Sequence, residues 1–259
     1  MKLNMGTYNI RYDFEHDGEN QWQYRKKHIF EQLKEANLDI IALQEVLHQP
    51  LQTFIELEDY DYFGVGRDDG AQEGEYNPIF YRADKYRRLD QGVIWLSKTP
   101  DVPSKDWNSG CNRILTYLKL EDKQTCVRFF VLNTHLDNAS EEARINQAKI
   151  IIDFIENYSQ GLPLVLCGDF NAYPDSEVIQ YLEKHLNNGH KIADYVSGPE
   201  GTYNDFSHDK QACEFKKIDY IFVGNKFKIS HIATHDIQFQ GKYISDHFMI
   251  TAKMEVSYD

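Results

Sequence analysis

Carboxylate, amide and imidazole side chains recur in this sequence where strand-like apolar runs end or begin. Because α/β sheets place ligands beyond the ends of their strands, such residues can meet at one sheet edge even when they lie far apart in the chain. A buried charge at that edge is costly unless it is paired or bound to a metal. The residues in such positions are Asn9, Glu45, His135, Asp169, Asn171, Asp219, Asp246 and His247.

Each of these residues taken singly has an ordinary structural explanation. An isolated Asp or Asn at a strand end more often forms a turn or caps a helix, and a lone His is more often structural than catalytic. Several of them on one edge make these explanations weaker. Glu45 and Asp246 offer the hard oxygen ligands that Mg²⁺ prefers, whereas the sequence has no His/Cys spacing typical of zinc. The pattern favours metal-assisted hydrolysis of a phosphate ester.

The composition argues against several kinds of partner. The formal net charge of −13 disfavours duplex DNA, because phosphate binding depends on Lys and Arg. No apolar run is long enough to span a membrane, and the first nine residues lack the apolar segment of a signal peptide. The four cysteines form no CxxC pair, which fits a reducing compartment. We therefore expect a cytoplasmic monomer that does not bind membranes.

The elements that position these residues follow from apolar periodicity. Residues 2–10 and 38–43 have the pattern of buried strands, and between them Trp22, Ile29, Leu33 and Ala36 recur at helical spacing, which predicts a β-α-β start. Short strands are predicted at residues 60–65, 78–81, 92–96, 114–120 and 126–133. Several have too little sequence between them for a crossover helix, so we expect antiparallel pairs.

The second half of the chain continues this alternation. A helix is predicted over residues 140–157, with Asn138 and Glu141 spaced as in a capping box. Further elements are predicted as a strand at 162–167, a helix at 176–186, and strands at 218–223, 229–234 and 247–253. The sequence contains no linker or repeat, so residues 1–259 are predicted to form a single domain of the α/β sandwich class.

Six short motifs in this order resemble those of the endonuclease/exonuclease/phosphatase superfamily, whose fold is that of deoxyribonuclease I. The resemblance spans Asn9 to His247 and implies a four-layer α/β sandwich, with two mixed, mainly antiparallel sheets packed together and helices outside. Each motif alone is weak evidence, whereas all six in order are highly specific. The motifs cover residues 8–11, 43–46, 133–137, 168–171, 218–221 and 245–248.

The resemblance also implies roles for individual residues. Glu45 would hold the catalytic Mg²⁺, or Mn²⁺ in its place, with Asn9 and Asp246 close to it. Asp169 would orient or deprotonate the attacking water. Asn171 would bind the phosphate, and His247, paired with Asp219, would lie beside the phosphoryl oxygens. His135 would lie on the opposite side of the phosphate and donate a proton to the leaving oxygen. The spacing does not decide which histidine is the acid, so the two roles can be exchanged.

Two further residues are matched by resemblance alone. Glu75 occupies the place of the glutamate that orients the histidine of the nuclease branch, and would therefore act on His135. Arg113 matches an arginine that contacts phosphate, although a surface salt bridge is the alternative for it. The run at residues 64–70 resembles a bacterial branch of the superfamily with poorly defined substrates. The loops at residues 13–21 and 201–208 are predicted either to line the pocket or to be solvated turns.

These observations rank the possible functions. A metal-dependent phosphoesterase that acts on a small molecule or a single-stranded phosphoester comes first, and a nuclease acting on single-stranded RNA or DNA comes second. A lipid phosphodiesterase is third, because the sequence shows no amphipathic segment for docking to a bilayer. A catalytically silent binding module is the alternative of a different class, since a fold does not determine a function.

Overall fold

The computed structural model describes residues 1–207 and 215–256, and its centre is a pair of large mixed sheets. The seven-stranded sheet has the spatial order β10 (Val196–Ser197), β12 (Phe227–His235), β15 (Met249–Val256), β1 (Lys2–Asn9), β2 (Ile40–Gln44), β4 (Ile79–Arg82) and β3 (Tyr60–Phe63). The six-stranded sheet has the order β5 (Tyr86–Trp95), β6 (Ile114–Asp122), β7 (Arg128–His135), β8 (Leu164–Asp169), β11 (Asp219–Val223) and β9 (Asn187–Asn188).

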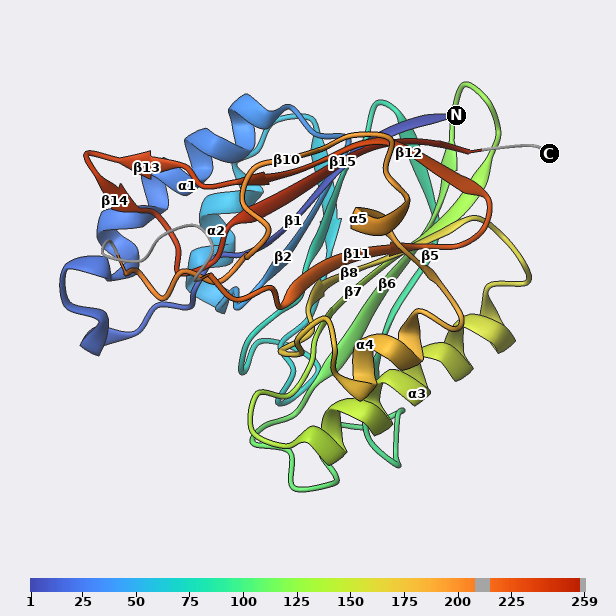
Figure 1. Cartoon of the computed structure of the whole chain (residues 1–259), viewed down its shortest axis with the longest axis horizontal. Helices are drawn as coiled ribbons and strands as arrows, with labels where there is room; N and C mark the ends of the chain where they lie inside the picture. Colours follow the sequence, from blue (N-terminus) through green and yellow to red (C-terminus); the bar gives the residue numbers. More distant parts are fainter. Residues whose placement is uncertain (208–214, 257–259) are drawn as a thin grey trace.

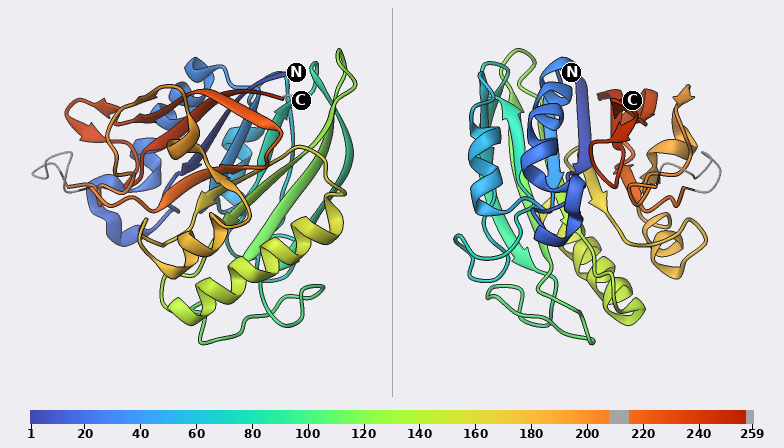
Figure 2. Two further views of the ribbon diagram at one scale, coloured as in Figure 1. Left: turned by 45° about the vertical axis from the view of Figure 1, so that its right-hand side comes forward. Right: turned by 90° about the vertical axis from the view of Figure 1, so that its left-hand side faces the viewer.

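Helices cover the outer sides of the two sheets (Figure 1; Figure 2 gives two further views). α1 (Trp22–Ala36) and α2 (His48–Ile55) share an apolar cluster with β1, β2 and β4. α3 (Glu141–Tyr158) and α4 (Glu177–Leu182) share another with β7, β8 and β11. The largest cluster lies between the sheets and contains Met5, Ile40, Val131 and Cys167. The predicted four-layer sandwich, with helices outside two packed sheets, is therefore confirmed.

The predicted pairing of the strands is also confirmed. β1 and β2 run parallel across α1, as a β-α-β unit requires, and β7 and β8 run parallel across α3. The pairs β3 with β4, β5 with β6 and β6 with β7 are antiparallel. The two ends of the described chain meet on one side, where the Val256 amide donates to the Met1 carbonyl (3.0 Å).

Several local predictions were wrong. Ser140, not Asn138, caps α3, because its side chain accepts a hydrogen bond from the Ala143 amide (3.1 Å) while the Asn138 side chain accepts one from Arg113. α4 is shorter than the predicted helix at 176–186. α2 was missed although Pro50 lies in its first turn, where proline is tolerated.

Smaller elements without a clear apolar period were missed as well. They are the 3₁₀ helix η1 (Glu15–Asn20), α5 (Gly189–Ile192), β9, β10, and the hairpin of β13 (Gln238–Phe239) and β14 (Lys242–Tyr243). Among the described residues, no helix is long and apolar enough to cross a membrane. Cys111, Cys126 and Cys167 are free thiols, whereas Cys213 and His208 lie outside the described residues.

Two buried amides join the sheets just below the edge that carries the predicted site residues. The Gln44 side-chain amide donates to Asn133 Oδ1 (2.7 Å) and to Thr7 Oγ1 (3.0 Å). Asn133 Nδ2 in turn donates to the carbonyls of Leu43 (2.8 Å) and Pro78 (3.1 Å). Gln44 and Asn133 belong to two of the sequence motifs, so part of each motif stabilises the sheet pair instead of touching substrate.

Replacing Asn133 by Leu should destabilise the protein, because it removes the buried hydrogen bonds that Asn133 makes with Gln44 and with the carbonyls of Leu43 and Pro78. We expect a loss of about 3 kcal/mol in the free energy of unfolding, measured by urea denaturation. The control is Asn157→Leu on the exposed side of α3, for which a change within about 0.5 kcal/mol is expected. Equal stability of the two variants would contradict the bridging role of Asn133.

Candidate active site

The predicted site residues meet at one edge of the molecule, where strands of both sheets end. β1 and β2 run parallel and so deliver Asn9 and Glu45 to the same edge, while Asp246 and His247 precede the antiparallel β15. β7, β8 and β11 do the same in the other sheet, where Asp169 is in register with both His135 and Asp219. A cavity of about 540 Å³ lies at this edge, lined among others by Glu45, Glu75, Arg113, His135, Asp169, Asn171, Asp246 and His247.

Asn9 joins the carboxylates of the two sheets. Its Nδ2 donates to Glu45 Oε1 (2.9 Å) on its own sheet and to Asp169 Oδ2 (3.0 Å) on the other. The second Glu45 oxygen accepts from the Tyr12 amide (2.9 Å). One ligand atom from each of Glu45, His135 and Asp169 lies within 4.8 Å of the others. Glu45 and Asp169 therefore face one cavity and are close enough to act on one bound phosphate.

His247 is held by a chain of hydrogen bonds. Its Nδ1 lies 2.8 Å from Asp219 Oδ2, and because a carboxylate can only accept, the ring carries its proton there. Asp219 is fixed in turn by Thr202, whose hydroxyl donates to the same oxygen (2.6 Å). The opposite ring nitrogen, Nε2, lies 3.7 Å from Asp169 Oδ2. Thr202 lies in the loop 201–208, for which the sequence left a pocket role open.

His135 lacks a comparable carboxylate partner. Its Nε2 lies 3.1 Å from Asn171 Nδ2, and its buried Nδ1 has no hydrogen-bond partner among the described residues. Glu75 lies 3.8 Å from that nitrogen, beyond hydrogen-bond distance. Both Glu75 oxygens instead accept from Arg67, at 2.7 and 2.9 Å. The structure thus brings Glu75 beside His135 as expected but pairs it with an arginine that the sequence did not single out.

Burial and mutual repulsion perturb the acids and bases of the site. Burial and then the charge of Asp219 raise the pKa of Asp169 to about 7. Burial also raises the pKa of Asp246 to about 6, against the opposing charge of His247. The pKa of His247 is raised well above its usual value because Asp219 and Asp169 outweigh its burial. Burial, and then Arg113 and Arg67, lower the pKa of His135 well below its usual value.

This donor set fits a hard divalent cation. Carboxylates of Glu45, Asp169 and Asp246 crowd one cavity, and the raised pKa values of Asp169 and Asp246 show that their ionised forms are disfavoured without a compensating charge. A bound cation would supply that charge. Carboxylate and amide oxygens with room for water suit Mg²⁺ or Mn²⁺ better than zinc.

Arginines form one wall of this acidic chain's cavity. Arg113 is 4% exposed, lies 3.5 Å from Asp137 and donates to Asn138 (3.2 Å), so it is not a surface salt bridge. Its Nε and Nη1 have no acceptor among the described residues. Arg67 and Arg144 also line the cavity. In the sequence, Arg67 belongs to the run at residues 64–70, which resembles a bacterial branch of the superfamily but was not assigned to the site.

Three residues at the strand ends adopt left-handed backbone conformations, which are uncommon for side chains with a Cβ. They are Arg11 (φ 56°), Glu45 (φ 60°) and Asn171 (φ 47°). Such strain concentrates at functional sites, where the surrounding structure holds it in place. Here each left-handed residue turns the chain within two residues of the end of a strand, and all three line the cavity.

A second cavity, of about 600 Å³, lies between α1 and the β13–β14 hairpin. It is lined by Tyr24, Arg25, His28 and Phe239, among others, and contains none of the predicted site residues. Its lining contains aromatic side chains and charged side chains of both signs. The predicted site residues therefore belong to the first cavity, although the second is slightly larger.

Comparison with known proteins places this arrangement in a family. The sequence profile of the Endonuclease/Exonuclease/phosphatase family matches residues 6–247. A crystal structure of an endonuclease/exonuclease/phosphatase from Bacteroides vulgatus is 37% identical, with a TM-score of 0.95, over 99% of this chain and 100% of that one. A mannosyl-6-phosphatase from Bacteroides thetaiotaomicron is 30% identical, with a TM-score of 0.90, over 98% and 99% of the two chains.

More distant similarity extends to a ribonuclease. The Ccr4 subunit of the CCR4-Not complex from Aspergillus niger, a 3'-5'-exoribonuclease, is 28% identical over 60% of this chain. This match covers only 31% of the Ccr4 subunit, so the chain corresponds to about a third of that protein's length. By its sequence, its fold and the set of acidic, amide and imidazole groups at its sheet edge, the chain belongs to the endonuclease/exonuclease/phosphatase family of phosphoesterases and nucleases.

Proposed function

We propose that this chain is a cytoplasmic, Mg²⁺-dependent phosphatase that hydrolyses the phosphate monoester of a small, polar compound such as a sugar. The observation that carries the proposal is the meeting of Glu45 and Asp169, from different sheets, in one cavity with His247. The choice of a monoester is supported by similarity along nearly the whole chain to a mannosyl-6-phosphatase. The net charge of −13 also favours a small substrate over a nucleic acid.

In the proposed reaction, water attacks the phosphorus in line with the departing oxygen, the bond from phosphorus to that oxygen breaks, and the released oxygen takes a proton from solvent water. Asp169 accepts a hydrogen bond from that water and takes up its proton, a role that suits a carboxylate with a raised pKa. His247, oriented by Asp219, and Asn171 hold the phosphoryl oxygens. Glu45, Asn9 and Asp246 would hold the metal, which when bound neutralises charge on the phosphoryl group.

His135 and His247 both approach Asp169 Oδ2 through Nε2, at 3.5 and 3.7 Å, and His135 is proposed to face the departing oxygen. Its Nε2 is close to Asn171, while no carboxylate lies within hydrogen-bond distance of Nδ1. His247 by contrast has the 2.8 Å partner Asp219. This asymmetry favours His247 as the phosphoryl ligand. The Asn171 amide can only donate, so His135 Nε2 accepts from it here, and His135 can donate to the leaving group from Nε2 only once the substrate displaces that amide.

A second candidate is a nuclease on single-stranded RNA, favoured by the similarity to the Ccr4 exoribonuclease subunit. That similarity covers a smaller part of the chain than the similarity to the phosphatase does. The same cavity residues would serve either substrate, because both reactions are displacements at phosphorus. The difference lies in what the cavity walls bind.

Asp169→Asn should abolish hydrolysis while the fold is retained, since the amide keeps the shape of the side chain but cannot take up the proton. We expect kcat for mannose 6-phosphate with Mg²⁺ to fall by roughly a factor of 10³, measured by phosphate release. The control is Asp153→Asn on the exposed face of α3. A purified Asp169→Asn enzyme with wild-type turnover would rule out the assigned role.

A substrate panel tests the choice between phosphatase and nuclease. We expect kcat/KM for hexose monophosphates to exceed that for single-stranded RNA by about 100-fold or more, because a hydrogen-bonding pocket strongly rejects a mismatched ligand. Single-stranded DNA and plasmid should not be cleaved. Faster cleavage of RNA than of every monoester would favour the nuclease instead.

Metal binding can be tested without turnover. In wild-type protein, Mg²⁺ should raise the melting temperature, because it binds only the folded arrangement of carboxylates. Glu45→Gln should lose this response, because the neutral amide is a poor ligand for a hard cation and cannot accept from both Asn9 and the Tyr12 amide as the carboxylate does. The measurement is differential scanning calorimetry with EDTA or Mg²⁺. An undiminished Mg²⁺ response in Glu45→Gln would exclude Glu45 as a ligand.

A further inference from the structure

Arg25 is a buried arginine whose hydrogen bonds, among the described residues, all go to backbone carbonyls, while its guanidinium also lies over the rings of Trp22 (5.7 Å) and Phe206 (5.5 Å). It is 4% exposed and lies on the inner face of α1. Its Nη1 donates to the carbonyls of Ile10 (2.7 Å) and Ile244 (3.1 Å), and its Nη2 donates to the carbonyl of Arg11 (3.0 Å). Its Nε donates to the carbonyl of Asn20 in η1. One side chain thus joins three separate segments of the chain.

Two of these segments carry the proposed metal ligands. Ile10 and Arg11 directly follow Asn9, and Ile244 lies two residues before Asp246. The same segments are joined once more by Ser245, whose hydroxyl donates to the Asn9 carbonyl (2.8 Å). The Arg25 guanidinium therefore fixes the distance between the end of β1 and the start of β15.

The position of Arg25 is unfavourable for the helix itself. Trp22, Ile29 and Leu33 form the apolar stripe of α1, and Arg25 lies between them on that buried face, where the helical period favours an apolar side chain. Its burial lowers its pKa, an effect that the nearby charge of Asp246 opposes. No carboxylate forms an ion pair with it among the described residues. A buried charge placed at such cost commonly marks a functional requirement.

Repulsion between carboxylates at the site explains why a residue that holds these backbone segments together is needed. Glu45 follows β2 and Asp246 precedes β15, and because both carboxylates line the same cavity their negative charges repel each other. Arg11, whose Nε lies 3.9 Å from Asp246 Oδ2, and the backbone contacts of Arg25 oppose this repulsion and keep the Asp246 segment beside the end of β1. A planar guanidinium can hold several carbonyls at once, whereas an ammonium group has no such fixed fork.

We propose that Arg25 is a positioning residue of the metal site, which holds the backbones of Asn9 and Asp246 at the separation that a divalent cation requires. This inference rests on the proposed function, because it assumes that these two residues lie at a metal. Arg25 does not line the catalytic cavity and therefore acts through the segments that it joins. Its loss should weaken metal binding before it affects anything else at the site.

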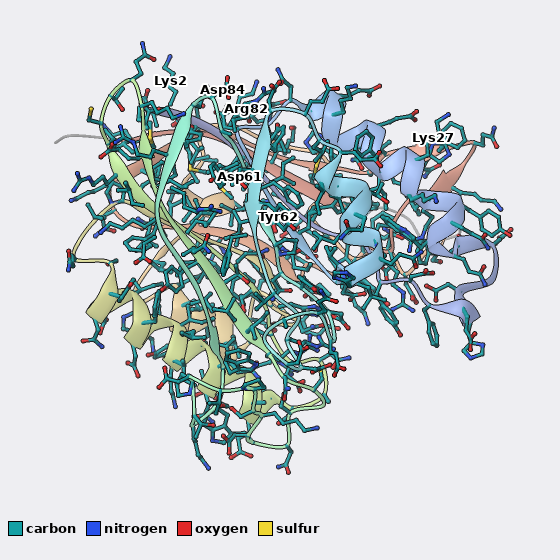
Figure 3. All side chains as sticks on the ribbon, turned by 180° about the vertical axis from the view of Figure 1, so that it is seen from behind. Lys2, Lys27, Asp61, Tyr62, Arg82 and Asp84 are labelled. Carbon is teal, nitrogen blue, oxygen red and sulfur yellow. The ribbon has the colours of Figure 1, made fainter. Side chains whose placement is uncertain are left out.

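The test is the affinity for Mn²⁺, measured by isothermal titration calorimetry on Arg25→Ala and Arg25→Lys. We expect dissociation constants raised by roughly 10- to 100-fold for Arg25→Ala, and by a smaller factor for Arg25→Lys. The matched control is Lys27→Ala, which removes one positive charge from the same helix at a side chain 77% exposed (Figure 3). That control should bind Mn²⁺ as wild type does.

Chemical rescue separates positioning from a general loss of structure. Arg25 lines the second cavity, so free guanidinium can reach the space left in Arg25→Ala. Millimolar guanidinium chloride should restore a large part of the Mn²⁺ affinity of Arg25→Ala, with no effect on wild type or Lys27→Ala. A folded Arg25→Ala whose lost affinity is not restored would overturn the proposal.

Should Arg25→Ala not fold, Arg25→Lys tests the positioning role instead. It keeps the positive charge but loses the planar guanidinium that binds several carbonyls at once. Wild-type Mn²⁺ affinity in a folded variant at position 25 would overturn the positioning role and leave the proposed function intact. Absence of Mn²⁺ binding by the wild-type protein would instead contradict the proposed function itself. The two failures are thus told apart by the wild-type titration.

Discussion

The crowding of carboxylates from two sheets into one cavity is the constraint on which the rest of this structure depends. Asp169 and Asp219 belong to one sheet, Glu45 and Asp246 lie next to strands of the other, and burial disfavours the ionised forms of Asp169 and Asp246. The positive charge of His247 and the amide of Asn9 compensate part of this cost. The folded state must therefore hold together groups that repel one another. It does so with neutral hydrogen-bond donors and with hydrogen bonds that link separate backbone segments.

These hydrogen bonds explain why the motifs contain residues that do not line the cavity. Gln44 and Asn133 bond across the sheets, and Thr202 fixes the acid that orients His247. Each lies within a residue or two of a cavity residue or bonds to one directly. The left-handed conformations of Glu45 and Asn171 add strain that a looser scaffold would release. Rigidity at this edge is thus a property of the whole sheet pair.

The sequence predicted what depends on periodicity and on chain order. The β-α-β start, the antiparallel pairs and the meeting of distant strand ends all follow from apolar spacing and from the rule that α/β sheets bind ligands at strand ends. Arg25 was not found because an arginine on a helix is normally a solvated residue, and only tertiary structure shows that it is buried. The cap of α3 was misassigned because Asn138 and Ser140 both suit the position, and the Arg113 side chain, distant in sequence, binds Asn138.

The pairing of Glu75 with Arg67 determines which groups the cavity wall beside His135 offers to a substrate. A carboxylate whose two oxygens already accept from a guanidinium is a poor partner for a second group, and His135 Nδ1 is accordingly unbonded among the described residues. A neutral imidazole can donate a hydrogen bond but is a weak source of protons. The wall instead presents the guanidiniums of Arg67 and Arg113, which bind oxygen acceptors and release no proton. Its chemistry is therefore suited to selecting the substrate by its oxygens, in keeping with the proposal that the acids and His247 act on the phosphoryl group.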